Sequence, residues 1–177
     1  MRRTRKILQG ALLLMLLVSS GATAAVAQQQ SYLSGNDEYE LELPSPTWKA
    51  TPRAESAHQH MEFIYGERSD GYLRTRKEVV EANTSLSELA RREQDLKLRY
   101  LPGFVGGKEE RFAGRLSGIT VSYEYTNAGK AMAGRIYYLQ ADNRTVYALH
   151  FTARAERLQA IRNQTDAIAR SFRLKQQ

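Results

Sequence analysis

Alternating apolar and polar residues, the pattern of half-buried β-strands, recur along the chain from residue 39 onward. The first such stretch covers residues 39–43 and ends at Pro44-Ser45-Pro46. Residues 61–65 and 72–80 flank a connection rich in glycine and aspartate, which predicts a β-hairpin. Short turns separate four more stretches, at residues 111–114, 118–125, 131–140 and 145–151. Because parallel neighbours need long crossovers, these turns predict an antiparallel meander.

Two other stretches carry apolar residues at the spacing of an amphipathic helix. Ser85-Leu86-Ser87-Glu88 fits a capping box, so a helix should begin there and stop at Pro102-Gly103. Glu93 interrupts the apolar stripe of this helix, which predicts a narrow contact with a sheet and an otherwise exposed helix. A second helix is expected over residues 155–172, with an inward stripe of Leu158, Ile161, Thr165, Ile168 and Phe172.

The first 27 residues have the three parts of a secretory signal peptide. Basic residues up to Lys6 precede the apolar run of residues 11–18, and small residues follow as far as Ala27. The run is well short of the ~20 residues that a spanning helix needs, which favours cleavage near Ala27 over an uncleaved anchor. We therefore expect a signal peptide at residues 1–27, a flexible polar lead-in at residues 28–36, and a single domain at residues 37–174.

Net charge and cysteine content exclude several classes of function. Lys and Arg number 26 against 19 Asp and Glu, which gives a formal charge of +7. Four of these cations lie in the predicted signal peptide, and the +3 that is left is too dispersed to predict a nucleic-acid surface. The absence of cysteine argues against disulfides, thiolate nucleophiles, Cys-ligated zinc and a lipobox anchor.

The three histidines give one weak candidate for a metal site. His58, His60 and Glu62 alternate along a predicted strand and so share one face, a spacing that suits metal ligands. A fourth ligand would have to come from elsewhere, so we predict no metal site and keep a metal-dependent hydrolase with these residues as the enzyme alternative. His150 lies in a strongly apolar strand, where a hydrogen-bonded structural histidine is expected.

No catalytic, cofactor-binding or metal-binding residue is predicted, and no cofactor. Neither a G-x-S-x-G elbow nor a GxxxxGK[ST] phosphate loop occurs in the sequence. The acidic pairs Asp37-Glu38 and Glu109-Glu110 are expected to be solvated charges. The glycine-rich loop at residues 101–107 either presents Phe104 and Val105 to a partner or lets Phe104 fold back over the helix end.

Ten tyrosines are many for a chain of 177 residues, and several interleave on the predicted strands. An RNA-stacking platform would need basic neighbours, whereas the neighbours here are Thr, Ser and Glu. We interpret the tyrosines as amphipathic edges of the core whose hydroxyls reach water.

Several packing motifs carry a family resemblance. They are residues 39–49 (YELELPSPTWK), Phe112-x-Gly114, the tyrosine-rich hairpin, residues 146–153 and residues 168–172. In these motifs and in the order of its elements, the chain resembles the PsbP-like family. This family includes the extrinsic subunit P of photosystem II, a small Ran-binding protein of the same fold and secreted bacterial proteins of unknown function.

The resemblance implies an α+β fold, an α/β/α sandwich with a central antiparallel sheet of about six to seven strands and a helix on each face. It also implies a non-enzymatic binding or assembly role. No residue of the chain matches a calcium, manganese or photosystem contact, so none of these is carried over.

We therefore expect a secreted or periplasmic, non-enzymatic binding or accessory module. Its partner would be an unknown protein or small ligand of the cell envelope, with no nucleic acid and no membrane span in the mature form. Two alternatives stay open. One is the metal-dependent hydrolase using His58, His60 and Glu62, and the other is an envelope protein that binds a small ligand or lipid between sheet and helix.

Overall fold

The computed structural model describes residues 30–33, 38–55 and 58–175. The predicted signal peptide and its cleavage site near Ala27 lie outside these residues. In order, the described elements are β1 (Gln30–Leu33), β2 (Tyr39–Leu43), β3 (Trp48–Glu55), β4 (His58–Tyr65), β5 (Tyr72–Val79), α1 (Leu86–Leu96), the 3-10 turn η1 (Leu98–Tyr100), β6 (Val105–Ala113), β7 (Ser117–Asn127), β8 (Lys130–Gln140), β9 (Thr145–Arg154), α2 (Ala155–Ala160), α3 (Arg162–Ser171) and β10 (Arg173–Leu174).

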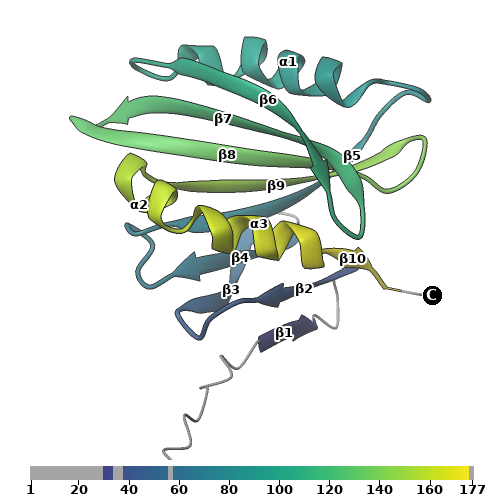
Figure 1. Ribbon diagram of the computed structural model, residues 1–177, viewed down its shortest axis with the longest axis horizontal. Helices are drawn as coiled ribbons and strands as arrows, with labels where there is room; N and C mark the ends of the chain where they lie inside the picture. The colour runs from purple at the N-terminus through teal and green to yellow at the C-terminus, as the bar shows by residue number, and fades with distance from the viewer. Residues whose placement is uncertain (1–29, 34–37, 56–57, 176–177) are drawn as a thin grey trace, which may run out of the picture.

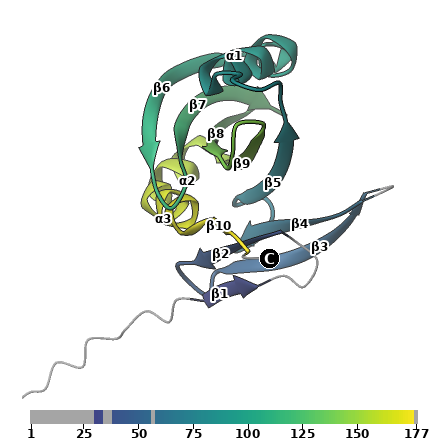
Figure 2. The same cartoon turned by 90° about the vertical axis from the view of Figure 1, so that its right-hand side faces the viewer.

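The centre of the described structure is a seven-stranded antiparallel sheet in the order β3-β4-β5-β9-β8-β7-β6. The predicted meander is confirmed, since β6 to β9 pair in sequence order. Helix α1 covers one face and helices α2 and α3 cover the other, and the sheet curves so that β5 and β6 lie on either side of α1 (Figure 1, Figure 2). A small sheet, β1-β2-β10, packs beside β3 and β4. The predicted α+β sandwich is thus confirmed.

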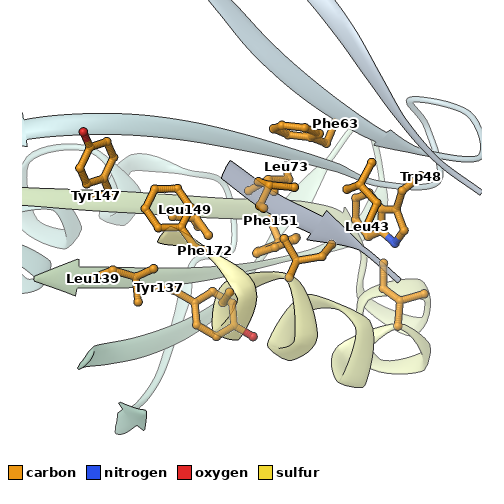
Figure 3. Close-up of a cluster of buried hydrophobic side chains, with 14 of the residues drawn as sticks. Leu43, Trp48, Phe63, Leu73, Tyr137, Leu139, Tyr147, Leu149, Phe151 and Phe172 are labelled. Carbon is orange, nitrogen blue, oxygen red and sulfur yellow. The ribbon is translucent and has the colours of Figure 1, made fainter. Parts of the chain in front are cut away.

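The sheet carries a core on each face because successive residues of a strand point in opposite directions. On β8, Tyr137 and Leu139 join the core under α2 and α3, whereas Ile136 and Tyr138 join the core under α1. Strand β8 is therefore buried on both faces. Figure 3 shows the larger core, in which the labelled residues are Leu43, Trp48, Phe63, Leu73, Tyr137, Leu139, Tyr147, Leu149, Phe151 and Phe172.

Both predicted helices are present. The Ser85 hydroxyl accepts a 3.1 Å hydrogen bond from the backbone N–H of Glu88, which caps α1 as the capping box predicts. The C-terminal helix is divided at Ile161 into α2 and α3, which the sequence pattern did not predict. The predicted stripe of this helix is buried in full, and it consists of Leu158, Ile161, Thr165, Ile168 and Phe172.

Two strands correct the sequence-based expectation. Gln30–Leu33, expected to be part of a flexible lead-in, form β1 and pair with β2, and the Tyr32 ring packs edge-on against Phe63 with centroids 4.8 Å apart. The fold therefore begins upstream of residue 37. Strand β3 was not predicted because Pro52 lies within it, and proline is tolerated there since β3 is an edge strand.

Candidate functional site

The β7–β8 hairpin projects past helix α2 (Figure 1), and a groove of about 660 Å³ lies between the helix and strands β6, β7 and β8. We call it the α2 groove. Small residues such as Gly107 and Ala133 form its floor, while Gln159 of α2 contributes to its wall. A side chain at position 107 would place its Cβ only 2.6 Å from the Ser122 carbonyl oxygen, so glycine both fits the close strand approach and keeps the floor low.

A buried arginine also lines the α2 groove. Arg135 of β8 is only 6% exposed. Its Nε donates to the Tyr137 hydroxyl at 2.7 Å, its Nη1 to Ser122 Oγ at 3.2 Å and its Nη2 to Asp166 Oδ1 at 3.2 Å. Desolvation alone would lower the pKa of Arg135, but the Tyr137 hydroxyl and the Asp166 carboxylate raise it. The guanidinium is therefore a fixed cation with a defined orientation.

The carboxylate of Asp166 links this arginine to helix α3. The Tyr137 hydroxyl donates to Asp166 and lies 3.0 Å from Thr165 Oγ1, so the helix is tied to the sheet by polar contacts as well as by its apolar stripe. Next to this network, Arg162 Nη2 donates to Glu110 Oε2 at 3.3 Å. The arginines and acids at this end of the groove thus form pairs.

A second groove, of about 530 Å³, opens between β5 and α1, and we call it the α1 groove. Glu93 lines it although its side chain is only 7% exposed. Arg76 Nη2 and the Tyr138 hydroxyl both donate to Glu93 Oε2 at 2.8 Å. Burial alone would raise the pKa of Glu93, but Arg76 and the Tyr138 hydrogen bond lower it, so the carboxylate stays ionised.

His150 lies on the same face of the sheet as this network and is half-buried, with Nε2 2.6 Å from the Tyr123 hydroxyl. Burial lowers the pKa of His150 to about 4, so the imidazole is neutral at physiological pH. Burial also raises the pKa of Tyr123, which keeps its hydroxyl protonated. The pair is a structural hydrogen bond within the fold, as the apolar sequence around His150 predicts.

The three residues of the metal alternative are placed only in part. His58 and His60 belong to strand β4, but their side chains lie outside the described part of the structure. The Glu62 carboxylate is buried and lies 3.0 Å from both Arg68 Nη1 and Arg74 Nε. Each oxygen of the Glu62 carboxylate thus already pairs with a guanidinium group. Among the described residues, no cluster of three or more His, Asp or Glu is arranged to hold a metal.

The structure also describes residues of both acidic pairs and of the glycine-rich loop that the sequence singled out. Glu109 is exposed and accepts from Ser87 Oγ at 2.6 Å, whereas Glu38 accepts from the Tyr147 hydroxyl at 2.9 Å. Strand β6 begins at Val105, so the predicted loop is shorter than expected. Phe104 packs against the core under α1, which supports the alternative in which it folds back, while Val105 is 62% exposed.

The tyrosines lie deeper than the sequence suggested. Tyr123, Tyr137, Tyr138 and Tyr147 are all buried, so their rings cannot form an exposed stacking platform. The expectation that tyrosine hydroxyls reach water is wrong for Tyr137 and Tyr138, which donate to carboxylates on α3 and α1 respectively. The sequence carried one signal for these hydrogen bonds, because an acid lies near the apolar stripe of each predicted helix. These acids are Glu93 in the first helix and Asp166 in the second.

The fold is similar to that of several solved structures. LpqN of Mycobacterium tuberculosis, described as involved in cell envelope biogenesis, aligns over 84% of this chain and 92% of its own, with 15% identity and a TM-score of 0.56. Cyanobacterial PsbP (CyanoP) from Synechocystis aligns over 89% and 99%, with 14% identity and a TM-score of 0.57. The fold is PsbP-like. At these identities the likeness concerns the fold alone.

A third structural neighbour is PA94 of Pseudomonas aeruginosa, a protein of unknown function described as a putative regulator. It aligns over 84% of this chain and 99% of its own, with 11% identity and a TM-score of 0.51. No protein-family model and no curated protein sequence matches the chain. In the described residues, none of the helices combines the length and apolar character needed to cross a bilayer.

Proposed function

We propose that this chain is an exported, non-enzymatic binding or accessory module of the cell envelope, and that the α2 groove is its binding site. The observation that carries the proposal is the groove itself, an opening of about 660 Å³ at a point where a helix leaves three strands uncovered. Its inner end holds a fixed guanidinium, which is suited to orienting a bound molecule.

The chemistry around the groove favours binding over catalysis. Arg135 and Asp166 neutralise each other, and the Tyr137 hydroxyl is held between Asp166 and Thr165. A general base or nucleophile needs a free lone pair or a displaceable proton near the substrate. These groups instead have fixed structural partners, which supports a site that orients a ligand without reacting with it.

The envelope location is supported by the N-terminal sequence pattern and by the described role of LpqN in envelope biogenesis. Export is tested by fractionating cells that express the full chain and by determining the N-terminal residue of the mature protein. Gln28 as the new N-terminus, in the periplasmic or extracellular fraction, supports the proposal. A full-length cytoplasmic protein contradicts it.

Binding in the α2 groove is tested by photo-crosslinking in living cells. A photoreactive amino acid replaces Gln159 in the groove wall, and the matched control replaces Lys49, an exposed residue on the distant edge strand β3. The expected result is a defined covalent adduct, protein or small molecule, that forms from position 159 and not from position 49. Equal adducts at both positions, or none at either, contradict a role for this groove.

A further inference from the structure

The α2 groove offers hydrogen-bond donors that the protein does not use. A guanidinium carries five N–H groups. Those of Arg135 meet three acceptors within hydrogen-bond distance, namely the Tyr137 hydroxyl, Ser122 Oγ and Asp166 Oδ1. The nearest other carboxylate, Glu110, is 3.9 Å from Nη2, beyond hydrogen-bond distance. Two N–H groups of a nearly buried guanidinium are thus left for an acceptor oxygen that enters the groove.

The charge of the groove decides which acceptor is suitable. Arg135 pairs with Asp166, and Arg162 pairs with Glu110, so these four charges cancel. Glu124 of β7 and Glu156 of α2 line the groove from opposite sides, are exposed, and form no ion pair within the part of the chain that the structure describes. Among the described charged residues that line the groove, these two carboxylates are thus the ones that no ion pair balances. They disfavour anionic ligands and favour one that combines a neutral acceptor oxygen with a positive charge.

The edge of the sheet favours an extended chain as that ligand. Strand β6 is the last strand of the sheet among the described residues, so one side of its backbone has no strand partner there. It enters the groove at Val105-Gly106-Gly107, where two residues without side chains expose the backbone and Val105 offers an apolar contact. A peptide main chain supplies carbonyl oxygens for both Arg135 and an exposed strand edge.

From these three features, and on the basis of the proposed function, we infer that the α2 groove binds an extended peptide segment that carries lysine or arginine. A main-chain carbonyl of the peptide accepts from the two remaining N–H groups of Arg135. The basic side chain lies between the carboxylates of Glu124 and Glu156. The occupant is thus a basic, extended segment of a partner protein.

The inference is tested with a random peptide library displayed on phage and selected against the immobilised mature protein. The expected result is enrichment of sequences with lysine or arginine flanked by β-branched residues. The selected peptide is then synthesised with a fluorescent label, and its affinity is measured by anisotropy. Affinity should fall as salt rises, because exposed ion pairs are screened.

Variants separate the two parts of the site. The double variant Glu124→Gln/Glu156→Gln should bind the peptide about tenfold more weakly, since each exposed ion pair contributes modestly to the affinity. The control Glu88→Gln, in the α1 groove, should leave its affinity unchanged. Arg135→Lys should weaken binding while retaining the preference for basic peptides, because lysine cannot reproduce the planar fork. Thermal unfolding of each variant confirms that it is folded.

Selection of acidic peptides, selection of none, or equal affinity for the double variant and the wild-type protein overturns the inference. If photo-crosslinking from position 159 yields a small molecule or a carbohydrate, the inference fails while the proposed binding function stands. If no adduct forms at position 159 and no peptide is selected, both fail.

Discussion

Tyr138 donates a hydrogen bond to Glu93 over 2.8 Å, and this contact joins strand β8 to helix α1. Arg76 of β5 donates to the same carboxylate oxygen, so one buried acid fastens the helix to two strands. The apolar contacts of α1 with the core come from Ala90, which is buried, and from Leu86 and Leu89, which are partly buried. The polar anchor adds a directional contact to this packing.

Replacement of Glu93 by alanine should lower the free energy of unfolding by about 2 to 3 kcal/mol. The buried Tyr138 hydroxyl loses its acceptor, and Arg76, which is partly exposed, loses its ion pair. Tyr138→Phe removes one donor and keeps the ion pair, so it should cost about 1 to 2 kcal/mol. Urea unfolding measures the free energy of unfolding of both variants. Asp95→Ala, an exposed carboxylate on the same helix, is the control and should stay within about 0.5 kcal/mol of wild type.

His150 should make the protein less stable in mild acid. Its pKa is about 4 in the folded state because of burial, against an ordinary value of 6.5 in the unfolded chain. As the pH falls from 6.5 toward 4, the unfolded state takes up a proton that the folded state does not, so stability decreases. Between about pH 6.5 and about pH 5, this amounts to about 2 kcal/mol.

Urea unfolding at several pH values measures this slope, and His150→Gln removes it while keeping a polar partner for Tyr123. Glu93, Arg76, Arg74 and Lys97 are the charged groups that influence His150. The lowered pKa of Glu93 adds a loss in the same direction, but at lower pH, as the folded-state carboxylate is protonated. An unchanged slope between about pH 6.5 and about pH 5 in the His150→Gln variant would show that another group is responsible.

Local sequence patterns predicted the parts of the fold that depend on neighbouring residues. The alternation at residues 39–43 gave the bounds of β2, and the Ser85 capping box gave the start of α1. Both signals reside within a few residues of the element that they define. Strand β3 depends instead on pairing with β4 over its whole length, and Pro52 conceals it in any local pattern.

The candidate site could not be predicted in the same way because it is made of distant residues. Arg135 is hydrogen-bonded to Asp166, which lies 31 positions away in the sequence. Glu93 is hydrogen-bonded to Tyr138, 45 positions away. A charged residue on an apolar stripe looks like an interruption until the strand opposite it is known. The groove itself depends on where α2 ends relative to the β7–β8 hairpin, which is a tertiary relationship.

The pairing of Glu62 with Arg68 and Arg74 leads to a prediction about metals. Addition of Zn²⁺ should not raise the melting temperature of the protein, because the carboxylate already serves two guanidinium groups at 3.0 Å. Glu62→Gln should lower the free energy of unfolding by about 1 to 3 kcal/mol, since both arginines lose a charged acceptor. The exposed Glu67→Gln is the matched control. A zinc-dependent rise in melting temperature that disappears when His58 and His60 are both replaced by alanine would favour the metal-dependent alternative.

Gly134 of β8 provides a test of the packing that holds His150 in place. A Cβ at this position would come within 2.1 Å of the Tyr123 ring, because this ring packs directly over the glycine. The hydroxyl of the same ring contacts His150. Gly134→Ala should therefore displace Tyr123, weaken its hydrogen bond with His150, and lower the free energy of unfolding by about 1 to 3 kcal/mol. Ala131→Val, at an exposed position of the same strand, should change stability little. In Gly134→Ala, the pKa of His150 measured by NMR should also rise toward its ordinary value as water reaches the ring. A variant as stable as the wild-type protein with an unchanged His150 pKa would mean that the ring and the added methyl group are accommodated without disturbing the pair.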